Sequence, residues 1–349
     1  MTEPAPDDPA PKPAPDDRGT RPAPDDPAPK PATSGAIAAL ARSGLLASGE
    51  TALPAEAADL ADARLVGQPW AAVRPILAEL GFAAVAANGD GARTYAAYDR
   101  DADRWLWLRL HPGQSADDPA RRSVRGPSAD PGPSADPGPS ADPGPSADRG
   151  PRKVRAPRND RAPGLVVAVL GPDGAGKSSL TAAVARSFIL PVREFYAGLY
   201  PADRRRFSKP GLATVALLLR LWRLAVGAAW HRRRGRLVLF DRYAYDARLP
   251  LPPSAGRRTR LRRALLARSL PTPDLVVVLD APAEVLLSRR REHPIEVVEA
   301  QRRRYAELAD SVPDGVIVDA SPDADSVRRT VTDLIWRRYV GRQIRRPPS

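Results

Sequence analysis

Apolar runs alternate with amphipathic segments along the C-terminal half of the chain. Each run is short and continuous, which is typical of a strand buried on both faces of a parallel sheet. The segments between the runs carry apolar residues at helical spacing. Alternation of strands and helices predicts an α/β fold with a doubly wound parallel sheet. The predicted strands are 165–170, 237–240, 275–279 and 316–318, and the predicted helices are 178–188, 212–231, 257–268, 296–309 and 325–339.

A second, smaller folded unit is predicted from 36–115. Helical spacing of apolar residues predicts helices over 37–46 and 70–80. Alternation of apolar and polar residues predicts strands over 93–98 and 104–110. The pattern therefore indicates a small α+β unit, whose size is marginal for a core of its own.

Low-complexity segments flank this small unit. The decamer PAPDDPAPKP occurs twice in 1–35, and the hexamer GPSADP recurs in 116–161. The chain has 41 prolines, and segments of this kind bury too little apolar surface to offset their ordering entropy. We expect both to be disordered spacers. The predicted organisation is a tail (1–35), the α+β unit (36–115), a linker (116–161), the α/β domain (162–340) and a basic tail (341–349).

Charge and composition narrow the class of partner. The formal net charge is +13, but no aromatic-interleaved basic motif accompanies it, so we expect phosphate-rich small ligands rather than a nucleic-acid partner. The chain has no cysteine, which fits a cytoplasmic protein. The apolar segment 212–231 approaches membrane-spanning length. Arg220 and Arg223 in its middle each cost about 2.5–3.5 kcal/mol in a bilayer, so a buried helix is predicted, with attachment to a membrane surface as the alternative.

The segment GPDGAGKSS fits the P-loop pattern without a mismatch. Glycines let the backbone curl so that its N–H groups face phosphates, and the following helix N-terminus favours the same negative charge. Lys177 would reach the β- and γ-phosphates of ATP, and the Ser178 hydroxyl would ligate Mg²⁺. The predicted ATP-binding residues are Gly171, Pro172, Asp173, Gly174, Ala175, Gly176, Lys177, Ser178 and Ser179.

The triplet Asp241-Arg242-Tyr243 directly follows a predicted parallel strand. A carboxylate at the C-terminal end of such a strand points into the crevice where ligands bind. Asp241 is therefore a candidate for Mg²⁺ binding or for orienting the acceptor, and Arg242 for bidentate binding of an acceptor phosphate. A helix cap beside a surface arginine is the alternative.

These motifs resemble those of the thymidylate kinase family over residues 162–340. The resembling segments are the P-loop with its acidic third position, the Asp-Arg-Tyr triplet, and PDLVVVLDAPAEVLLSRRREH at 273–293. The resemblance implies ATP and Mg²⁺ as cofactors and contacts from Asp173, Arg242 and Tyr243 to the acceptor nucleotide. It also implies a lid whose arginines, Arg289 and Arg291, act in catalysis, although a solvated charge run would look the same. A homodimer is a possible assembly.

The implied reaction is transfer of a phosphoryl group from ATP to a nucleoside monophosphate, with dTMP as the best candidate (dTMP + ATP to dTDP + ADP). The family's Arg-Glu-Pro-Gly-Gly segment is replaced here by VREFYAGLY at 192–200, which leaves the acceptor base open. We expect an apolar, aromatic acceptor lining (Phe195, Tyr196, Tyr200, Trp222) and hence weak base discrimination. A kinase of another small acceptor, such as a sugar, and a non-catalytic ATP-binding regulatory module are the alternatives.

The small unit resembles a worn fragment of a nucleotidyltransferase-like domain. An active member needs two carboxylates one residue apart on a strand, whereas this chain has Asp62 followed by Arg64. We interpret the unit as catalytically inactive, and expect a chain that begins near Arg161 to keep kinase activity.

Overall fold

The computed structural model describes residues 32–52, 60–87, 90–113, 163–199, 210–249, 254–291 and 293–344. The predicted N-terminal tail, the linker, Tyr200 and most of the basic C-terminal tail lie outside the described residues.

The C-terminal half contains the predicted parallel sheet. Its five strands lie in the order β10-β9-β6-β8-β7, and each pair of neighbours is parallel. All four predicted strands are present. The strand that the sequence did not predict, β7, lies at the sheet edge, where its half-exposed residues give no continuous apolar run. The strands are β6 (Val166–Leu170), β7 (Val192–Tyr196), β8 (Leu237–Asp241), β9 (Leu275–Asp280) and β10 (Gly315–Asp319).

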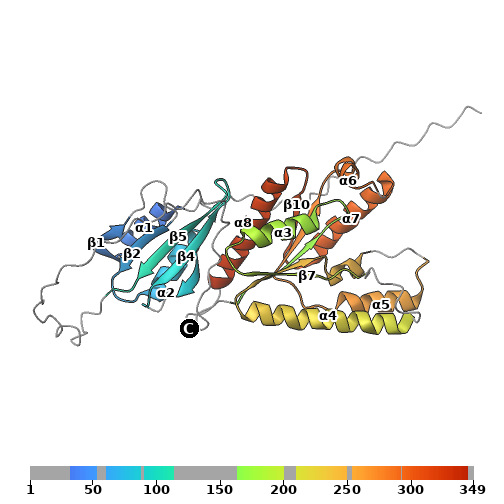
Figure 1. Cartoon of the computed structure of the whole chain (residues 1–349), viewed down its shortest axis with the longest axis horizontal. Coiled ribbons are helices and arrows are strands. Elements are labelled where there is room, and N and C mark those ends of the chain that lie inside the picture. Colours follow the sequence, from blue (N-terminus) through green and yellow to red (C-terminus); the bar gives the residue numbers. More distant parts are fainter. Residues whose placement is uncertain are drawn as a thin grey trace, which may run out of the picture.

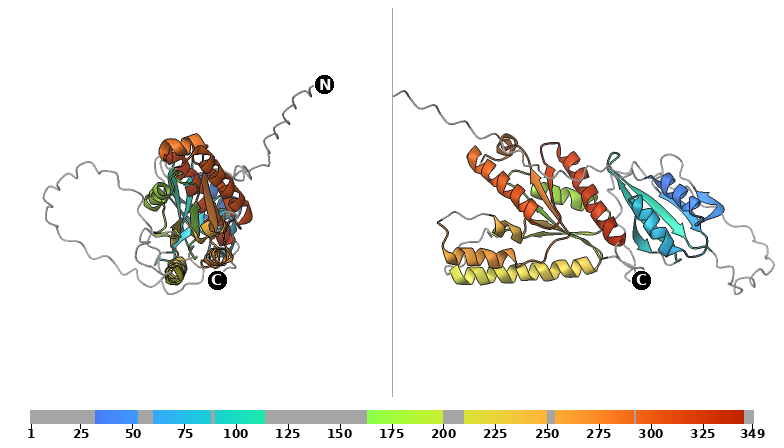
Figure 2. Two further views of the ribbon diagram at one scale, coloured as in Figure 1. Left: turned by 90° about the vertical axis from the view of Figure 1, so that its right-hand side faces the viewer. Right: turned by 180° about the vertical axis from the view of Figure 1, so that it is seen from behind.

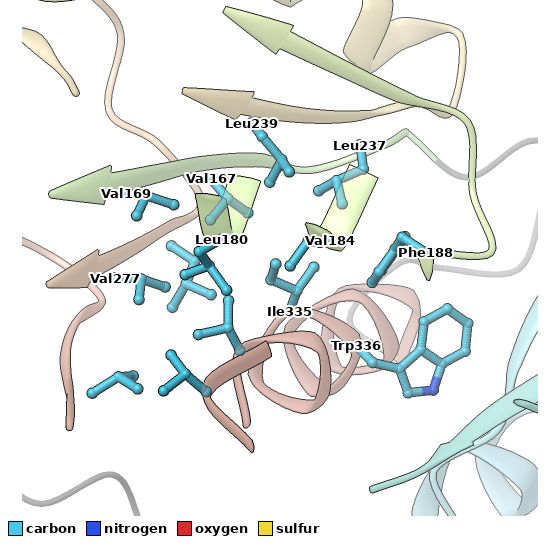
Figure 3. Packing of buried hydrophobic residues seen from close by; sticks show 14 of the residues in the cluster. Val167, Val169, Leu180, Val184, Phe188, Leu237, Leu239, Val277, Ile335 and Trp336 are labelled. Atoms are coloured by element: carbon cyan, nitrogen blue, oxygen red, sulfur yellow. The ribbon is translucent and has the colours of Figure 1, made fainter. Parts of the chain in front are cut away.

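Helices cover both faces of this sheet, which confirms the doubly wound α/β fold. One face packs on α3 and α8, as shown by the side chains around Val167, Leu180 and Ile335 (Figure 3). The opposite face packs on α4, α5 and α7. The helices are α3 (Lys177–Ser187), α4 (Pro210–Arg233), α5 (Arg257–Ala267), α6 (Ala283–Arg289), α7 (Ile295–Ser311) and α8 (Ala324–Ile344), with a short 3-10 helix, η3 (Ala244–Arg248).

The sequence predicted a buried helix over 212–231, but helix α4 is buried on one side only. Its inner side reaches the core through Leu217, Leu221 and Ala228, whereas an outward row is exposed because residues three and four apart share one side of a helix. This row consists of Val215, Leu219, Trp222, Val226 and Trp230. None of the described helices is long and apolar enough to cross a membrane.

The N-terminal unit is a mixed five-stranded sheet with two helices on one face. Its strand order is β1-β2-β5-β4-β3, with β2 and β5 parallel and the other neighbours antiparallel. The predicted helix 37–46 ends earlier, at Arg42, because Gly44 takes a positive φ of 66° and the chain turns into a strand. The elements are α1 (Thr33–Arg42), β1 (Leu46–Ala52), β2 (Leu60–Leu65), α2 (Trp70–Glu79), β3 (Ala83–Ala87), β4 (Arg93–Asp99) and β5 (Arg104–His111).

The open face of the N-terminal sheet packs against α8 and the end of α3 (Figures 1 and 2). Trp105 lies at the centre of this contact, with ring centroids 4.9 Å from Trp336 and 5.4 Å from Phe188. Its Nε1 donates a hydrogen bond to the carbonyl of Ser187 at 3.2 Å. Buried apolar residues of the two sheets consequently form one continuous cluster.

Polar contacts fix the same interface. Nε1 of Trp336 donates to the carbonyl of Gly81 at 3.0 Å. The side-chain amide of Gln343 pairs with both the N–H and the carbonyl of Ala84, at 3.1 and 3.0 Å. Arg328 forms a two-point ion pair with Asp103. The two sheets are thus separate in topology but share a core.

Candidate active site

The P-loop connects the end of β6 to the start of α3. Gly171, Gly174 and Gly176 have φ of 139°, 87° and 85°, which residues with a Cβ rarely adopt. A Cβ on Gly171 would also lie 2.3 Å from the carbonyl oxygen of Leu279 in β9. At Gly171, backbone conformation and close packing therefore both require glycine. The predicted ATP-binding residues lie together, in this loop and the first turn of α3.

Lys177 lies inside the curl of the loop and is only 7% exposed. Its Nζ donates to the carbonyls of Gly171 and Pro172 at 2.9 and 2.6 Å, and lies 3.8 Å from a carboxylate oxygen of Asp173. Burial, and then the positive charge of Arg242, lower the pKa of Lys177 to about 8, against the opposing effect of nearby carboxylates. The lysine is held where a phosphate ligand would meet it.

Ser178 and Asp241 lie side by side at the C-terminal edge of the sheet. The Ser178 hydroxyl donates to a carboxylate oxygen of Asp241 at 2.5 Å. Among the described residues, no group of three or more His, Cys, Asp or Glu side chains could hold a metal ion. A hydroxyl and a carboxylate are hard oxygen donors of the type that Mg²⁺ accepts when substrate phosphates and water complete its shell. The pair therefore fits the predicted Mg²⁺ site.

Arg242 occupies a strained position beside the P-loop. Its φ of 65° is uncommon for a residue with a side chain, and such strain clusters at functional sites. The guanidinium forms an ion pair with Asp173 and lies 3.8 Å from Asp246. Burial would raise the pKa of Asp173, but the charges of Arg242 and Lys177 outweigh it and the pKa is lowered. The structure thus joins Arg242 to the P-loop.

A cavity of about 350 Å³ opens between the P-loop, η3 and α7. Asp173 and Arg242, two of the three predicted acceptor-binding residues, line it. The third, Tyr243, does not: it is fully buried and its hydroxyl donates to the carbonyl of Pro271. The full lining is Asp173, Tyr196, Gly198, Leu199, Arg242, Asp246, Leu249, Arg263, Gln301, Arg304 and Tyr305.

The predicted apolar, aromatic lining is wrong for two of its three described members. Tyr196 lines the cavity. Phe195 instead is half-buried and packs against the core, with its ring centroid 5.4 Å from that of Phe240, because alternate residues of a strand point to opposite faces. Trp222 is 62% exposed on the outer side of α4.

Polar residues that the sequence reasoning missed line the cavity instead. Gln301, Arg304 and Tyr305 come from α7, and their spacing of three and four residues places them on one side of that helix. Asp246 follows the Asp-Arg-Tyr triplet on η3. Helical spacing in 296–309 could have indicated that these α7 residues share a side, but not that this side meets the P-loop.

The arginines of the predicted lid differ in their surroundings. Arg289 ends α6 and donates to the carbonyl of Ala320 at 2.9 Å, and Arg291 is exposed. Arg290 is the one against the P-loop: a Cβ on Gly174 would lie 3.4 Å from its Cβ, and its charge contributes to lowering the pKa of Asp173. The reason is that the backbone becomes extended at Arg290 after α6 ends.

Comparison with known proteins supports the same chemistry. The chain is 32% identical over 191 residues to thymidylate kinase from strains of Xanthomonas campestris pv. campestris, a match that covers 48% of this chain and 80% of the relative. The chain belongs to the thymidylate kinase family. This membership confirms the predicted enzyme class, a nucleoside monophosphate kinase.

Other comparisons are more distant. A probable thymidylate kinase from Archaeoglobus fulgidus is 30% identical over 108 residues, which cover 29% of this chain and 54% of the relative. The solved thymidylate kinase of Candida albicans is 18% identical, with a TM-score of 0.40, and the alignment covers 50% of this chain and 91% of that one. No family model matches the chain.

Proposed function

We propose that this thymidylate kinase family member transfers the γ-phosphoryl group of ATP to dTMP, giving dTDP and ADP. The observation that carries the proposal is the position of Asp173, which belongs to the P-loop and also lines the adjoining cavity. A donor held by the loop and an acceptor held in the cavity would be neighbours, which is the main requirement of phosphoryl transfer.

On the donor side, the loop backbone and Lys177 would bind the ATP phosphates. Ser178 and Asp241 would hold Mg²⁺, which when bound neutralises charge on the phosphates. Arg290 stands against the loop, so we propose it as the lid arginine nearest the transferring group, with Arg289 and Arg291 able to contribute only after rearrangement. Lys177 now donates to loop carbonyls, and phosphate oxygens would replace these acceptors.

On the acceptor side, Arg242 would bind the acceptor phosphate. Its partner is currently Asp173, so acceptor binding exchanges one anionic partner for another. Arg304 is an exposed cation in the cavity lining and would bind the same acceptor phosphate. Arg263 donates to the carbonyls of Asp246 and Ala247 at 2.6 and 3.0 Å, which makes it a support for η3.

The polar lining also changes the expected base selectivity. A slot lined only by apolar groups would discriminate by about 10², whereas hydrogen-bonding groups can reach about 10⁴. Gln301 and Arg304 supply amide and guanidinium donors, and Tyr305 supplies a hydroxyl. We therefore propose a preference for dTMP over other pyrimidine nucleotides that exceeds the hundredfold expected from the sequence.

The test is a coupled ADP-release assay with dTMP, dUMP, dCMP, UMP and a panel of sugars as acceptors. We expect the highest kcat/KM for dTMP, and no turnover with any acceptor in Lys177→Ala. Exclusive turnover of a sugar would favour the second candidate, a kinase of another small acceptor. That candidate rests on the changed segment at 192–200, from which Tyr196 enters the cavity. ATP binding without turnover of any acceptor would indicate a regulatory module.

For the N-terminal unit we propose a structural role rather than a second catalytic site. Asp62 lies 3.4 Å from Nε2 of His111 and 3.9 Å from Nε of Arg109. Arg64 lies two residues after Asp62 on β2, so both side chains are on the same face of the sheet. Arginine and histidine side chains, rather than a second carboxylate, therefore lie beside the one acid that would otherwise bind a metal ion.

A further inference from the structure

One carboxylate of the N-terminal unit reaches into the kinase half. Asp103 lies in the turn between β4 and β5 and accepts two hydrogen bonds from the guanidinium of Arg328 in α8. The hydroxyl of Tyr98 donates to the same carboxylate at 2.6 Å. Beside this pair, the guanidinium of Arg100 donates to the hydroxyl of Thr330 at 2.9 Å. The turn between two strands of the N-terminal unit is therefore fixed to the first two turns of α8.

The position of the Arg328 side chain depends on this carboxylate. The side chain is only 11% exposed. Its other ion pair is with Asp325 of the same helix, whose side chain is 76% exposed, and exposed pairs contribute little. Burial would raise the pKa of Asp103, but the hydrogen bonds from Arg328 and Tyr98 outweigh it and the pKa is lowered. Because a buried guanidinium without its partner is strongly unfavourable, loss of the Asp103 charge would displace Arg328 and the helical turn that carries it.

The start of α8 is tied to the segment before it. The segment 320–323 joins β10 to α8. The carboxylate of Asp323 accepts hydrogen bonds from the backbone N–H and the hydroxyl of Ser326, at 2.9 and 2.6 Å, and so caps the first turn of the helix. Arg328 lies two residues beyond Ser326. A displacement of Arg328 would therefore be transmitted to the segment 320–323.

The segment 320–323 contacts the strand and the helix between which the P-loop is packed. The N–H of Ala320 donates to the carbonyl of Asp280, the last residue of β9, at 2.6 Å. The residue before Asp280 is the one whose carbonyl packs against Gly171 in the P-loop. The carbonyl of Ala320 accepts from Arg289 at 2.9 Å, at the end of α6, and α6 also packs against the P-loop. The segment thus holds both neighbours of the loop.

We propose that Asp103 of the N-terminal unit is a positioning residue for ATP: through Arg328 and the segment 320–323, it sets the places of β9 and α6 around the P-loop. This inference rests on the proposed binding of ATP by the P-loop. Among the described residues that line the acceptor cavity, none belongs to α8 or to 320–323. The effect should therefore fall on the affinity for the donor nucleotide and leave the affinity for the acceptor unchanged. The N-terminal unit, which has no acid pair for a metal ion of its own, would thus act on the kinase site.

Separate measurements of donor and acceptor binding test the proposal. Isothermal titration with a non-hydrolysable ATP analogue and Mg²⁺ gives the donor Kd, and titration with dTMP gives the acceptor Kd, in the wild-type chain, Asp103→Asn, Arg328→Gln and the double variant. Asparagine tolerates the positive φ of 51° at this position, so Asp103→Asn removes the charge without backbone strain. Coupling through a packed network corresponds to about 2- to 30-fold in affinity. We expect each single variant to weaken binding of the ATP analogue by that factor, with the Kd of dTMP within about twofold of wild type.

A double-mutant cycle and a matched control separate this coupling from a general loss of stability. If Asp103 acts through Arg328, the double variant should lose no more ATP affinity than Asp103→Asn alone, because effects within one ion pair are not additive. The control is Arg337→Gln, since Arg337 pairs at 2.9 Å with Asp333 inside α8, and it should keep wild-type affinity for both ligands. Loss of folded material would lower the binding stoichiometry for both ligands alike. If Arg328→Gln is insoluble, Asp103→Asn alone decides.

Each outcome has a separate meaning. A Kd of the ATP analogue within about twofold of wild type in Asp103→Asn, with dTMP kinase activity present in the wild-type chain, overturns the inference and leaves the proposed function in place. Equal weakening of the ATP analogue and dTMP would indicate a general structural role and also overturn it, as would additive losses in the double variant. A wild-type chain that binds no ATP analogue and turns over no acceptor would instead overturn the proposed function, and this inference with it.

Discussion

Replacement of Trp105 by alanine should destabilise the whole protein, although Trp105 lies outside the kinase sheet. The ring is 7% exposed and contacts Tyr98 and Trp336, each with centroids 4.9 Å away, and Phe188 at 5.4 Å. Removing a buried tryptophan costs about 3–5 kcal/mol. The lost hydrogen bond to the Ser187 carbonyl adds about 1 kcal/mol. The expected loss, about 4–6 kcal/mol, is a large part of the stability of an ordinary domain.

Urea unfolding followed by circular dichroism measures this loss. The control is Trp222→Ala, since Trp222 is 62% exposed on α4 and its removal should change the free energy of unfolding by about 0.5 kcal/mol or less. One cooperative transition shifted by several kcal/mol is expected for Trp105→Ala, because the two sheets share a core. A shift below about 1 kcal/mol, or a separate early transition that leaves kinase activity intact, would refute the shared core.

Three further predictions concern the same interface and the P-loop. From the sequence we expected a truncated chain that lacks the N-terminal unit to keep kinase activity. The shared core predicts instead that a chain beginning at residue 163 is poorly soluble or inactive, because Phe188 and Trp336 would become exposed to solvent. A soluble truncation with wild-type kcat would disprove this prediction. Lys177→Ala should abolish phosphoryl transfer, because it removes the charge that would face the ATP phosphates. The urea midpoint of this variant should equal or exceed that of the wild-type chain, because the substitution removes a buried charge. With the pKa of Lys177 lowered to about 8, the protonated form is lost as pH rises through that value, so kcat/KM for ATP should fall above about pH 8. The fall in kcat should come at higher pH, because bound phosphates favour the protonated lysine, and coincident profiles would count against this assignment.

Much of the kinase half could be predicted from the sequence because its signals are local. A strand buried on both faces is a continuous apolar run, as in β6, β8 and β9, and the half-buried strand β10 at one edge of the sheet keeps a shorter run. Strand β7, at the other edge, has exposed polar residues in its middle and lacks such a run, and it was missed. The P-loop was recognisable because glycines, lysine and serine must follow one another at fixed spacing, so its geometry depends on few distant residues.

The residues of the proposed acceptor cavity were harder to predict because they meet only through the fold. Asp246 contacts Tyr305, 59 positions later in the chain, and its backbone is held by Arg263, 17 positions away. Because Tyr243 belongs to the same triplet as Arg242, the sequence reasoning placed both residues in the acceptor site. The positive φ of Arg242 turns the chain at this point, and Tyr243 enters the core while Arg242 reaches the cavity. If this cavity holds the acceptor, as proposed, variants of the contacts of η3 with α5 and α7 should change acceptor selectivity while the P-loop chemistry stays the same.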